Sequence, residues 1–175
     1  MTKHVVLVTL ACAILTTATS ARAQEDSQQA TRSPAAEATP FVALGSGTGV
    51  GAAVRWPLGS SPFSAELETS YRRVEVGSLS FNLSLLYDLP KLGPAVPYVA
   101  GGIGLDQYGT AELVAGKVLA RERTAFSVNA GGGIRVKTAE NWGVRTDARW
   151  FKDVGRMAPE RWRLYNGVTL GGAAR

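Results

Sequence analysis

Glu66 and Glu68 are the residues of this sequence whose type and spacing most resemble a paired acid and base. In a β-strand, alternate side chains point to the same face, so the two carboxylates would lie side by side, as glycoside-hydrolysing pairs do. Alternate acids on one face of a strand also serve as counter-ions, because carboxylates withdrawn from water need cationic partners. We interpret Glu66 and Glu68 as counter-ions of arginines.

A second candidate site is the run Gly47 to Ala52, which fits the G-x-G-x-x-A pattern of dinucleotide binding. That pattern needs a helix directly after the glycines, because the helix N-terminus holds the pyrophosphate. Here Arg55-Trp56-Pro57 follows instead, which predicts a strand and a turn. We interpret these glycines, and those at 101, 102, 104 and 131 to 133, as positions where strands thin and bend.

The first 23 residues predict a secretory signal peptide. Lys3 precedes an apolar run from Val5 to about Leu15, and Ala21-Arg22-Ala23 provides a small-x-small cleavage site before Gln24. Cys12 is a weaker match to a lipoprotein site, because the apolar run continues past it. The chain is therefore expected to be exported, with residues 24–40 as a flexible polar leader and 41–175 as the folded domain.

Removal of the signal peptide would remove His4 and Cys12, the single histidine and the single cysteine. Ser-His and Cys-His catalysis, histidine-ligated metals, thiolate zinc sites and disulfides are then excluded. The net charge of +5 includes Lys3 and Arg22, which leaves a mild +3 after cleavage. We predict no enzyme activity, no metal, no cofactor and no nucleic-acid partner.

Alternating polarity defines the elements that hold these residues. In residues 63–73, apolar and aromatic side chains at odd positions oppose polar ones at even positions. The same pattern predicts strands over 49–56, 63–73, 78–88, 97–108, 123–137, 142–152 and 160–171. Membrane barrels of bacteria have even strand numbers, so Phe41 to Ser46 is predicted as the eighth strand. The predicted fold is all-β, an antiparallel up-and-down transmembrane barrel of eight strands.

Large aromatic residues cluster at the ends of these strands, which is typical of a barrel wall that faces lipid. A soluble sheet would place them at mid-strand, in its core. The connections agree, because they are short on the predicted periplasmic side, whereas Gln107 to Arg123 on the other side is long. The predicted aromatic girdles comprise Trp56, Phe63, Tyr71, Tyr87, Tyr98, Tyr108, Trp142, Trp150 and Trp162.

The inward faces of the predicted strands carry charges of both signs. An eight-stranded barrel has an interior filled by side chains, and charges held there must pair. We predict an ion-pair network, with a narrow polar conduit as the alternative. Its members are Arg55, Glu66, Glu68, Arg72, Asp88, Asp106, Arg135, Arg145, Asp147, Arg149 and Arg163.

Three segments resemble the small outer-membrane β-barrel family, whose relatives include the opacity-type proteins and the barrel of outer membrane protein A. They are Pro97 to Gly104, Ala130 to Arg135 and Arg145 to Phe151, of which the Pro-Tyr-Val-x-x-Gly-x-Gly segment is the most specific. The resemblance implies a Gram-negative outer membrane, insertion by the barrel assembly machinery, and roles from envelope integrity to adhesion. It implies no catalytic site.

The leading hypothesis is a non-enzymatic, monomeric outer-membrane protein in contact with membrane lipids and lipopolysaccharide. Basic residues of the predicted loops could meet lipopolysaccharide phosphates: Arg72, Arg73, Lys117, Arg121, Arg123, Lys152 and Arg156. A narrow porin-like channel and a soluble secreted β-barrel that binds or adheres are the alternatives.

Overall fold

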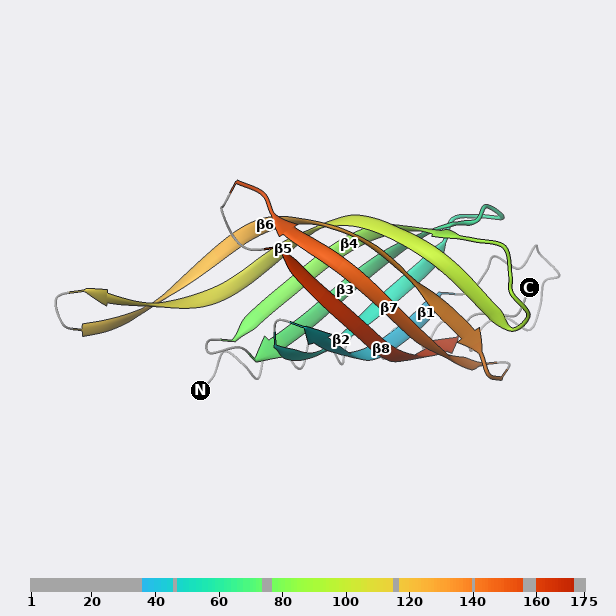
Figure 1. The fold of residues 1–175 in the computed structure, drawn as a ribbon, viewed down its shortest axis with the longest axis horizontal. Coiled ribbons are helices and arrows are strands. Elements are labelled where there is room, and N and C mark those ends of the chain that lie inside the picture. Colours follow the sequence, from blue (N-terminus) through green and yellow to red (C-terminus); the bar gives the residue numbers. More distant parts are fainter. Residues whose placement is uncertain are drawn as a thin grey trace, which may run out of the picture. The chain divides into compact units, whose positions relative to one another are not determined.

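Eight antiparallel strands close into one barrel in the computed structural model, as predicted (Figure 1). Each strand pairs with its neighbour in the sequence, and β1 pairs with β8 to close the sheet. The bounds are β1 Glu37–Gly45, β2 Thr48–Pro57, β3 Phe63–Arg73, β4 Ser78–Asp88, β5 Ala95–Val114, β6 Lys117–Lys137, β7 Trp142–Asp153 and β8 Arg161–Gly171.

The structure describes residues 36–45, 47–73, 77–114, 117–139, 141–155 and 160–171, with the backbone alone over 110–121. Within these ranges, no helix has the length and apolar character needed to cross a membrane. The predicted signal peptide lies outside the described residues.

The first strand begins earlier than predicted. Glu37 and Ala38, which we assigned to the polar leader, pair with Arg55 and Val54 of β2. Glu37 also pairs with Gly171 of β8. The barrel therefore begins at Glu37 and not at residue 41, because residues 37–40 complete the ladders on both sides of β1.

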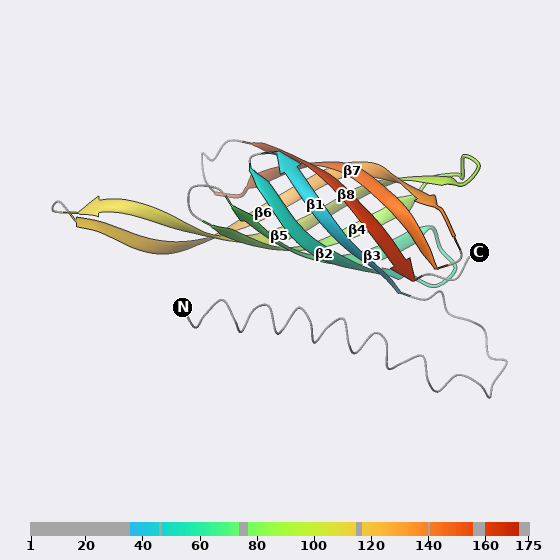
Figure 2. The same cartoon turned by 90° about the horizontal axis from the view of Figure 1, so that it is seen from below.

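The predicted long loop between Gln107 and Arg123 is a continuation of two strands. β5 and β6 pair without interruption from Ala95↔Val136 to Val114↔Lys117. No proline interrupts this segment, so the pairing extends past the strands that flank it, and the hairpin projects from one end of the barrel (Figures 1 and 2). We call this end the hairpin end, and the end with the connections 58–62, 89–94 and 138–141 the turn end.

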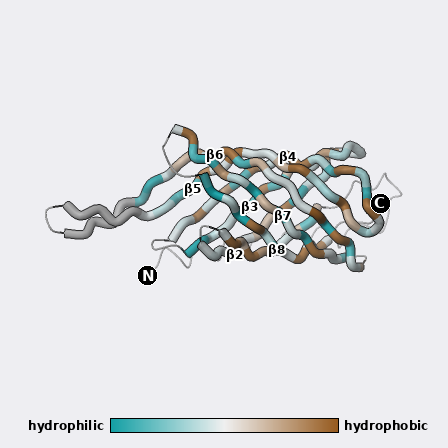
Figure 3. The backbone as a smooth tube through the Cα atoms, in the orientation of Figure 1, coloured by the Kyte–Doolittle hydropathy of each residue, from teal (hydrophilic) through white to brown (hydrophobic). Residues whose placement is uncertain are grey.

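Polarity in this barrel is inverted relative to a soluble protein. Arginines, carboxylates, serines and asparagines are buried, while large apolar side chains are exposed. Polar and apolar positions alternate along the strands (Figure 3). Leu83 is 52% exposed and Ile103 49% exposed, whereas Glu66 and Arg149 are fully buried. The outer surface thus forms an apolar belt around a charged interior.

Candidate functional site

The interior of the barrel balances its charges. Each charged residue of the interior lies at an inward-facing position of its strand. The regular pleat is therefore enough to bring residues from all eight strands together. Among the described residues, seven carboxylates and seven guanidinium groups point inward or form ion pairs with inward-pointing residues. They are Glu37, Glu66, Glu68, Asp88, Asp106, Asp147 and Asp153, and Arg55, Arg72, Arg135, Arg145, Arg149, Arg161 and Arg163.

The central cluster joins β7 to β3 across the lumen. Both Arg145 and Arg149 of β7 donate to the carboxylate of Glu66 on β3, Arg149 over 2.6 Å. Asp147 lies between the two arginines on β7 and accepts from Arg145 over 2.5 Å and from Arg149 over 3.3 Å. Since all four side chains are nearly inaccessible to solvent, each charge depends on these partners.

Glu68 occupies a second position in the central cluster. Its carboxylate accepts from Asn82 Nδ2 over 3.1 Å, from the Tyr165 hydroxyl over 3.2 Å and from Arg149 over 3.4 Å. Its shortest hydrogen bond is longer than the bond from Arg149 to Glu66, so Glu68 is held by several weaker bonds. Both glutamate side chains are buried within this cluster.

Tyr98 belongs to this cluster and not to an aromatic girdle. It is 2% exposed, its hydroxyl donates to Asp147 over 2.5 Å, and Arg145 Nε donates to that hydroxyl over 2.7 Å. We assigned Tyr98 to a girdle because it lies near a strand end, but its inward alternate places it in the lumen. Tyr108 is half-buried and lies two residues from the inward Asp106, on the same face of β5. It is therefore not an outward girdle residue either.

The turn-end cluster is a closed ring of two arginines and two carboxylates. Arg55 donates to Asp88 over 2.7 Å, and Arg135 donates to both Asp88, over 2.8 Å, and Glu37, over 2.7 Å. Arg55 also donates to Ser64 and lies 4.0 Å from Glu37. Glu37 was not predicted as a member of the network because it lay in the predicted leader.

The hairpin-end cluster is centred on Asp106. This carboxylate accepts from Ser80, from Arg161 over 3.0 Å and from Arg163 over 3.2 Å. Arg161 also donates to Asp153 over 2.6 Å. The prediction omitted Arg161 and Asp153, although both lie on the inward alternate that the sequence pattern defines.

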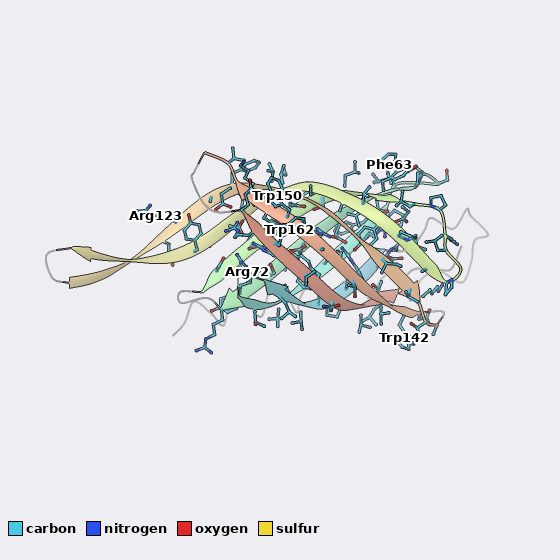
Figure 4. The ribbon with its side chains drawn as sticks, viewed as in Figure 1. Phe63, Arg72, Arg123, Trp142, Trp150 and Trp162 are labelled. Carbon is cyan, nitrogen blue, oxygen red and sulfur yellow. The ribbon has the colours of Figure 1, made fainter. Side chains whose placement is uncertain are left out.

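Arg72 is an interior residue and not a loop residue. It is 4% exposed and its guanidinium donates to Ser78 over 3.4 Å (Figure 4). We therefore no longer expect Arg72 to contact lipopolysaccharide. The side chains of Lys117 and Arg121, and residue Arg156, lie outside the described residues.

Apolar side chains fill the remaining lumen beside the central cluster. Phe41 and Tyr165 pack edge to face with ring centroids 5.0 Å apart. Gly51 leaves the room for this pair, because a Cβ there would lie 2.6 Å from Phe41 Cζ. The cavity between Phe41, Tyr165, Glu68 and Arg145 has a volume of about 10 Å³, enough for roughly one water molecule.

The other predicted girdle residues are at the two ends of the outer surface. Phe63 and Trp142 lie towards the turn end, and Trp150 and Trp162 towards the hairpin end (Figure 4). Trp56 and Tyr87 are near the turn-end termini of β2 and β4, and Tyr71 is near the hairpin-end terminus of β3. The rings of Phe63 and Tyr87 pack 5.0 Å apart. Indole and phenol rings prefer the boundary between hydrocarbon and water, so these two rings of residues delimit the apolar belt.

One exposed polar group accompanies the girdle at the hairpin end. Trp150 Nε1 donates to Glu160 over 3.0 Å, and Lys152 Nζ donates to the same carboxylate over 3.3 Å. The hydrogen bond from Trp150, followed by that from Lys152, lowers the pKa of Glu160 from its ordinary value. Lys152 is thereby held on the outer surface at the edge of the belt.

Two outward polar residues escaped sequence analysis. Thr146 and Asn166 are ladder partners on β7 and β8, and the threonine hydroxyl donates to the asparagine carbonyl over 2.8 Å. Both lie at outward-facing positions of strands whose other outward residues between the girdles are apolar. A polar residue at such a position was the signal that the sequence offered. Within the described ranges, no three His, Cys, Asp or Glu side chains are grouped so as to hold a metal ion.

No protein-family model and no curated protein sequence matches this chain, whereas several solved structures do. The N-terminal β-barrel domain of Pseudomonas aeruginosa OprF matches with a TM-score of 0.66 and 15% identity, over 77% of this chain and 95% of that domain.

Two further structures have the same architecture. A major outer membrane protein from Thermus thermophilus matches with a TM-score of 0.56 and 12% identity, over 78% of this chain and 99% of that one. Neisserial surface protein A matches with a TM-score of 0.54 and 16% identity, over 78% of this chain and 94% of that one. The chain therefore has the fold of the small eight-stranded outer-membrane barrels.

Proposed function

We propose that this protein is a non-enzymatic barrel of the outer membrane that has a structural role in the envelope and contacts lipopolysaccharide at its rim. The observation that carries the proposal is the inversion of polarity, with charges inside and an apolar belt outside. A soluble secreted barrel would expose this belt to water, at a cost proportional to its area. Lipid removes that cost, and the closed ladder leaves no backbone group unpaired at an edge.

The interior favours a structural role over transport. The three clusters tie opposite walls together, and the cavity beside the central cluster holds no more than about one water molecule. Buried ion pairs of this kind oppose opening, because separating them would leave unpaired charges in a medium of low dielectric constant. These contacts support a closed anchor whose function lies at its surface.

The girdle at the hairpin end supports the lipopolysaccharide contact. Trp150 and Trp162 are ladder partners, and Lys152 follows on the same outward alternate. An ammonium group beside interfacial indoles is placed at the level of anionic headgroups. With the tight connections in the periplasm, this girdle faces the outer leaflet, where the phosphates of lipopolysaccharide lie.

Two matched leucine substitutions test the membrane assignment. Leu83 is 52% exposed on the belt and Leu92 is 66% exposed in the turn between β4 and β5. In isolated outer membranes, wild-type protein should resist detergent until boiled and then change its gel mobility. Leu83→Arg should abolish this heat-sensitive form, because arginine at the bilayer midplane costs about 2–4 kcal/mol, whereas Leu92→Arg should retain it. Soluble wild-type protein, or equal tolerance of both changes, would refute the proposal.

A narrow channel is the alternative function, and planar bilayers decide between the two. Purified barrel should give no single-channel conductance steps while the central cluster is intact. Reproducible conductance steps from wild-type protein that disappear after heat denaturation would refute the structural role and support a channel.

A further inference from the structure

Thr146 and Asn166 form a polar pair at the middle of the apolar belt. Thr146 lies four residues from Trp142 and four from Trp150 along β7, and both polar side chains are exposed. The girdles mark the two boundaries of the belt, so the pair lies near the bilayer midplane. Polar side chains at this depth are costly and usually have a function.

The pair satisfies only part of the asparagine amide. Oδ1 of Asn166 accepts from Thr146 over 2.8 Å. The two N–H groups of Nδ2 make no hydrogen bond within the described part of the chain, and Oδ1 has a second lone pair. Lipid tails offer neither donors nor acceptors, so the amide needs a polar partner that reaches the midplane.

The surface around the pair is apolar and uncharged. We call it the β8 wall and define it by the outward residues of three adjacent strands between the girdles. Its members are Val144, Thr146 and Ala148 of β7, Leu164, Asn166 and Val168 of β8, and Pro40, Val42 and Leu44 of β1. Its side chains are short or of medium length, so another wall can approach closely and bring polar groups within hydrogen-bonding distance.

We propose that the β8 wall binds a second copy of this chain, with the two Asn166 side chains paired at the centre of the interface. In a two-fold arrangement each residue meets its own equivalent, and a primary amide is its own complement. Nδ2 of each Asn166 would donate to Oδ1 of the partner's Asn166, while Thr146 keeps the other lone pair. A second copy brings an amide to the required depth by symmetry, whereas lipid ester groups lie at the interface with water.

This inference rests on the proposed membrane location and departs from the monomer expected from the sequence. That expectation took no account of the lipid-facing wall. The dimer would be weak, because only one amide pair distinguishes the β8 wall from lipid.

Cysteine cross-linking in isolated outer membranes tests the dimer. In a Cys12→Ser background, Leu164→Cys and Val168→Cys flank Asn166, while Leu83→Cys lies on β4, on the opposite wall of the closed barrel. Oxidation should yield disulfide-linked dimers from positions 164 and 168 but not from 83. Adding Asn166→Leu should lower the dimer yield about tenfold, the loss expected for hydrogen bonds of this kind within a membrane, and Asn166→Gln should restore part of it.

Three results would overturn the inference while leaving the membrane proposal intact, provided that each variant shows the heat-sensitive gel mobility of a folded barrel. They are the absence of cross-links from both positions 164 and 168, equal cross-linking from position 83, and an unchanged dimer yield with Asn166→Leu. Protein recovered only in the soluble fraction would instead refute both proposals.

Discussion

Arg149 and Glu66 face each other across the lumen, and the arginine donates to the glutamate over 2.6 Å. They come from β7 and β3, which lie on opposite walls of a barrel closed in the order of the sequence. The bond is therefore a cross-brace, and it ties together strands that share no backbone hydrogen bond. Closure of the sheet holds each strand to two neighbours, while the brace resists flattening of the whole ring.

Glu66→Ala should destabilise the barrel strongly. The change removes one of the two carboxylates that both Arg145 and Arg149 contact, in a site with almost no access to water, and leaves only Asp147 as their shared acceptor. Breaking a buried ion pair by removing one partner costs about 3–5 kcal/mol. We expect the free energy of unfolding, measured in urea with lipid vesicles, to fall by about this amount. Glu160→Gln removes an exposed carboxylate at the rim, whose contacts are screened by water, so it should lower the free energy of unfolding far less. Equal effects of the two variants would contradict the brace.

Tyr98→Phe tests the placement of this ring inside the lumen. The hydroxyl lost in this variant donates to Asp147 and accepts from Arg145, so the change removes one hydrogen bond from each of these two buried charged groups. The expected loss in unfolding free energy is about 1–3 kcal/mol. Tyr87→Phe is the matched control, because Tyr87 faces outward and is 37% exposed. Similar stability of the two variants would return Tyr98 to the girdle.

The difference between Tyr98 and Tyr87 illustrates what the sequence could predict. Alternation is a local property of one strand, so the strands and most of the inward charges followed from spacing. The membrane barrel followed from this spacing together with the aromatic positions and the connection lengths. Tyr98 was wrongly assigned to a girdle because its position near a strand end was given more weight than the inward face of the strand on which it lies. The pairing of Arg149 with Glu66 depends on the stagger of eight strands, which no local pattern contains. The length of the β5–β6 hairpin was missed because its residues alternate less clearly than those in the wall.

Trp150→Phe should raise the pKa of Glu160. The indole N–H is the first cause of the lowered pKa of this carboxyl group, and phenylalanine keeps the ring but donates no hydrogen bond. The pKa of Glu160 in the folded protein lies below the ordinary value of 4.5, so the contact stabilises the folded state at pH values above 4.5. This stabilisation is lost as the pH falls through the folded pKa. A carboxyl-carbon NMR titration in detergent micelles should show the Glu160 midpoint moving up towards 4.5 in the variant. An unchanged midpoint would assign the shift to Lys152 alone.

Gly133→Ala and Gly101→Ala separate glycines that make room from glycines that do not. A Cβ at Gly133 would overlap Asp147 Cβ and lie 2.7 Å from the Tyr98 hydroxyl, both in the central cluster. A Cβ at Gly101 would meet nothing closer than the Asn129 carbonyl oxygen at 3.9 Å. Neither glycine has a positive φ, so the backbone tolerates alanine at both positions and packing alone should decide the outcome. Overpacking costs about 1–3 kcal/mol, so Gly133→Ala should lower the urea midpoint in vesicles while Gly101→Ala leaves it unchanged or raises it slightly. If both variants lost stability equally, strand bending would be the role of Gly133, and the tight fit around Tyr98 and Asp147 would be wrong.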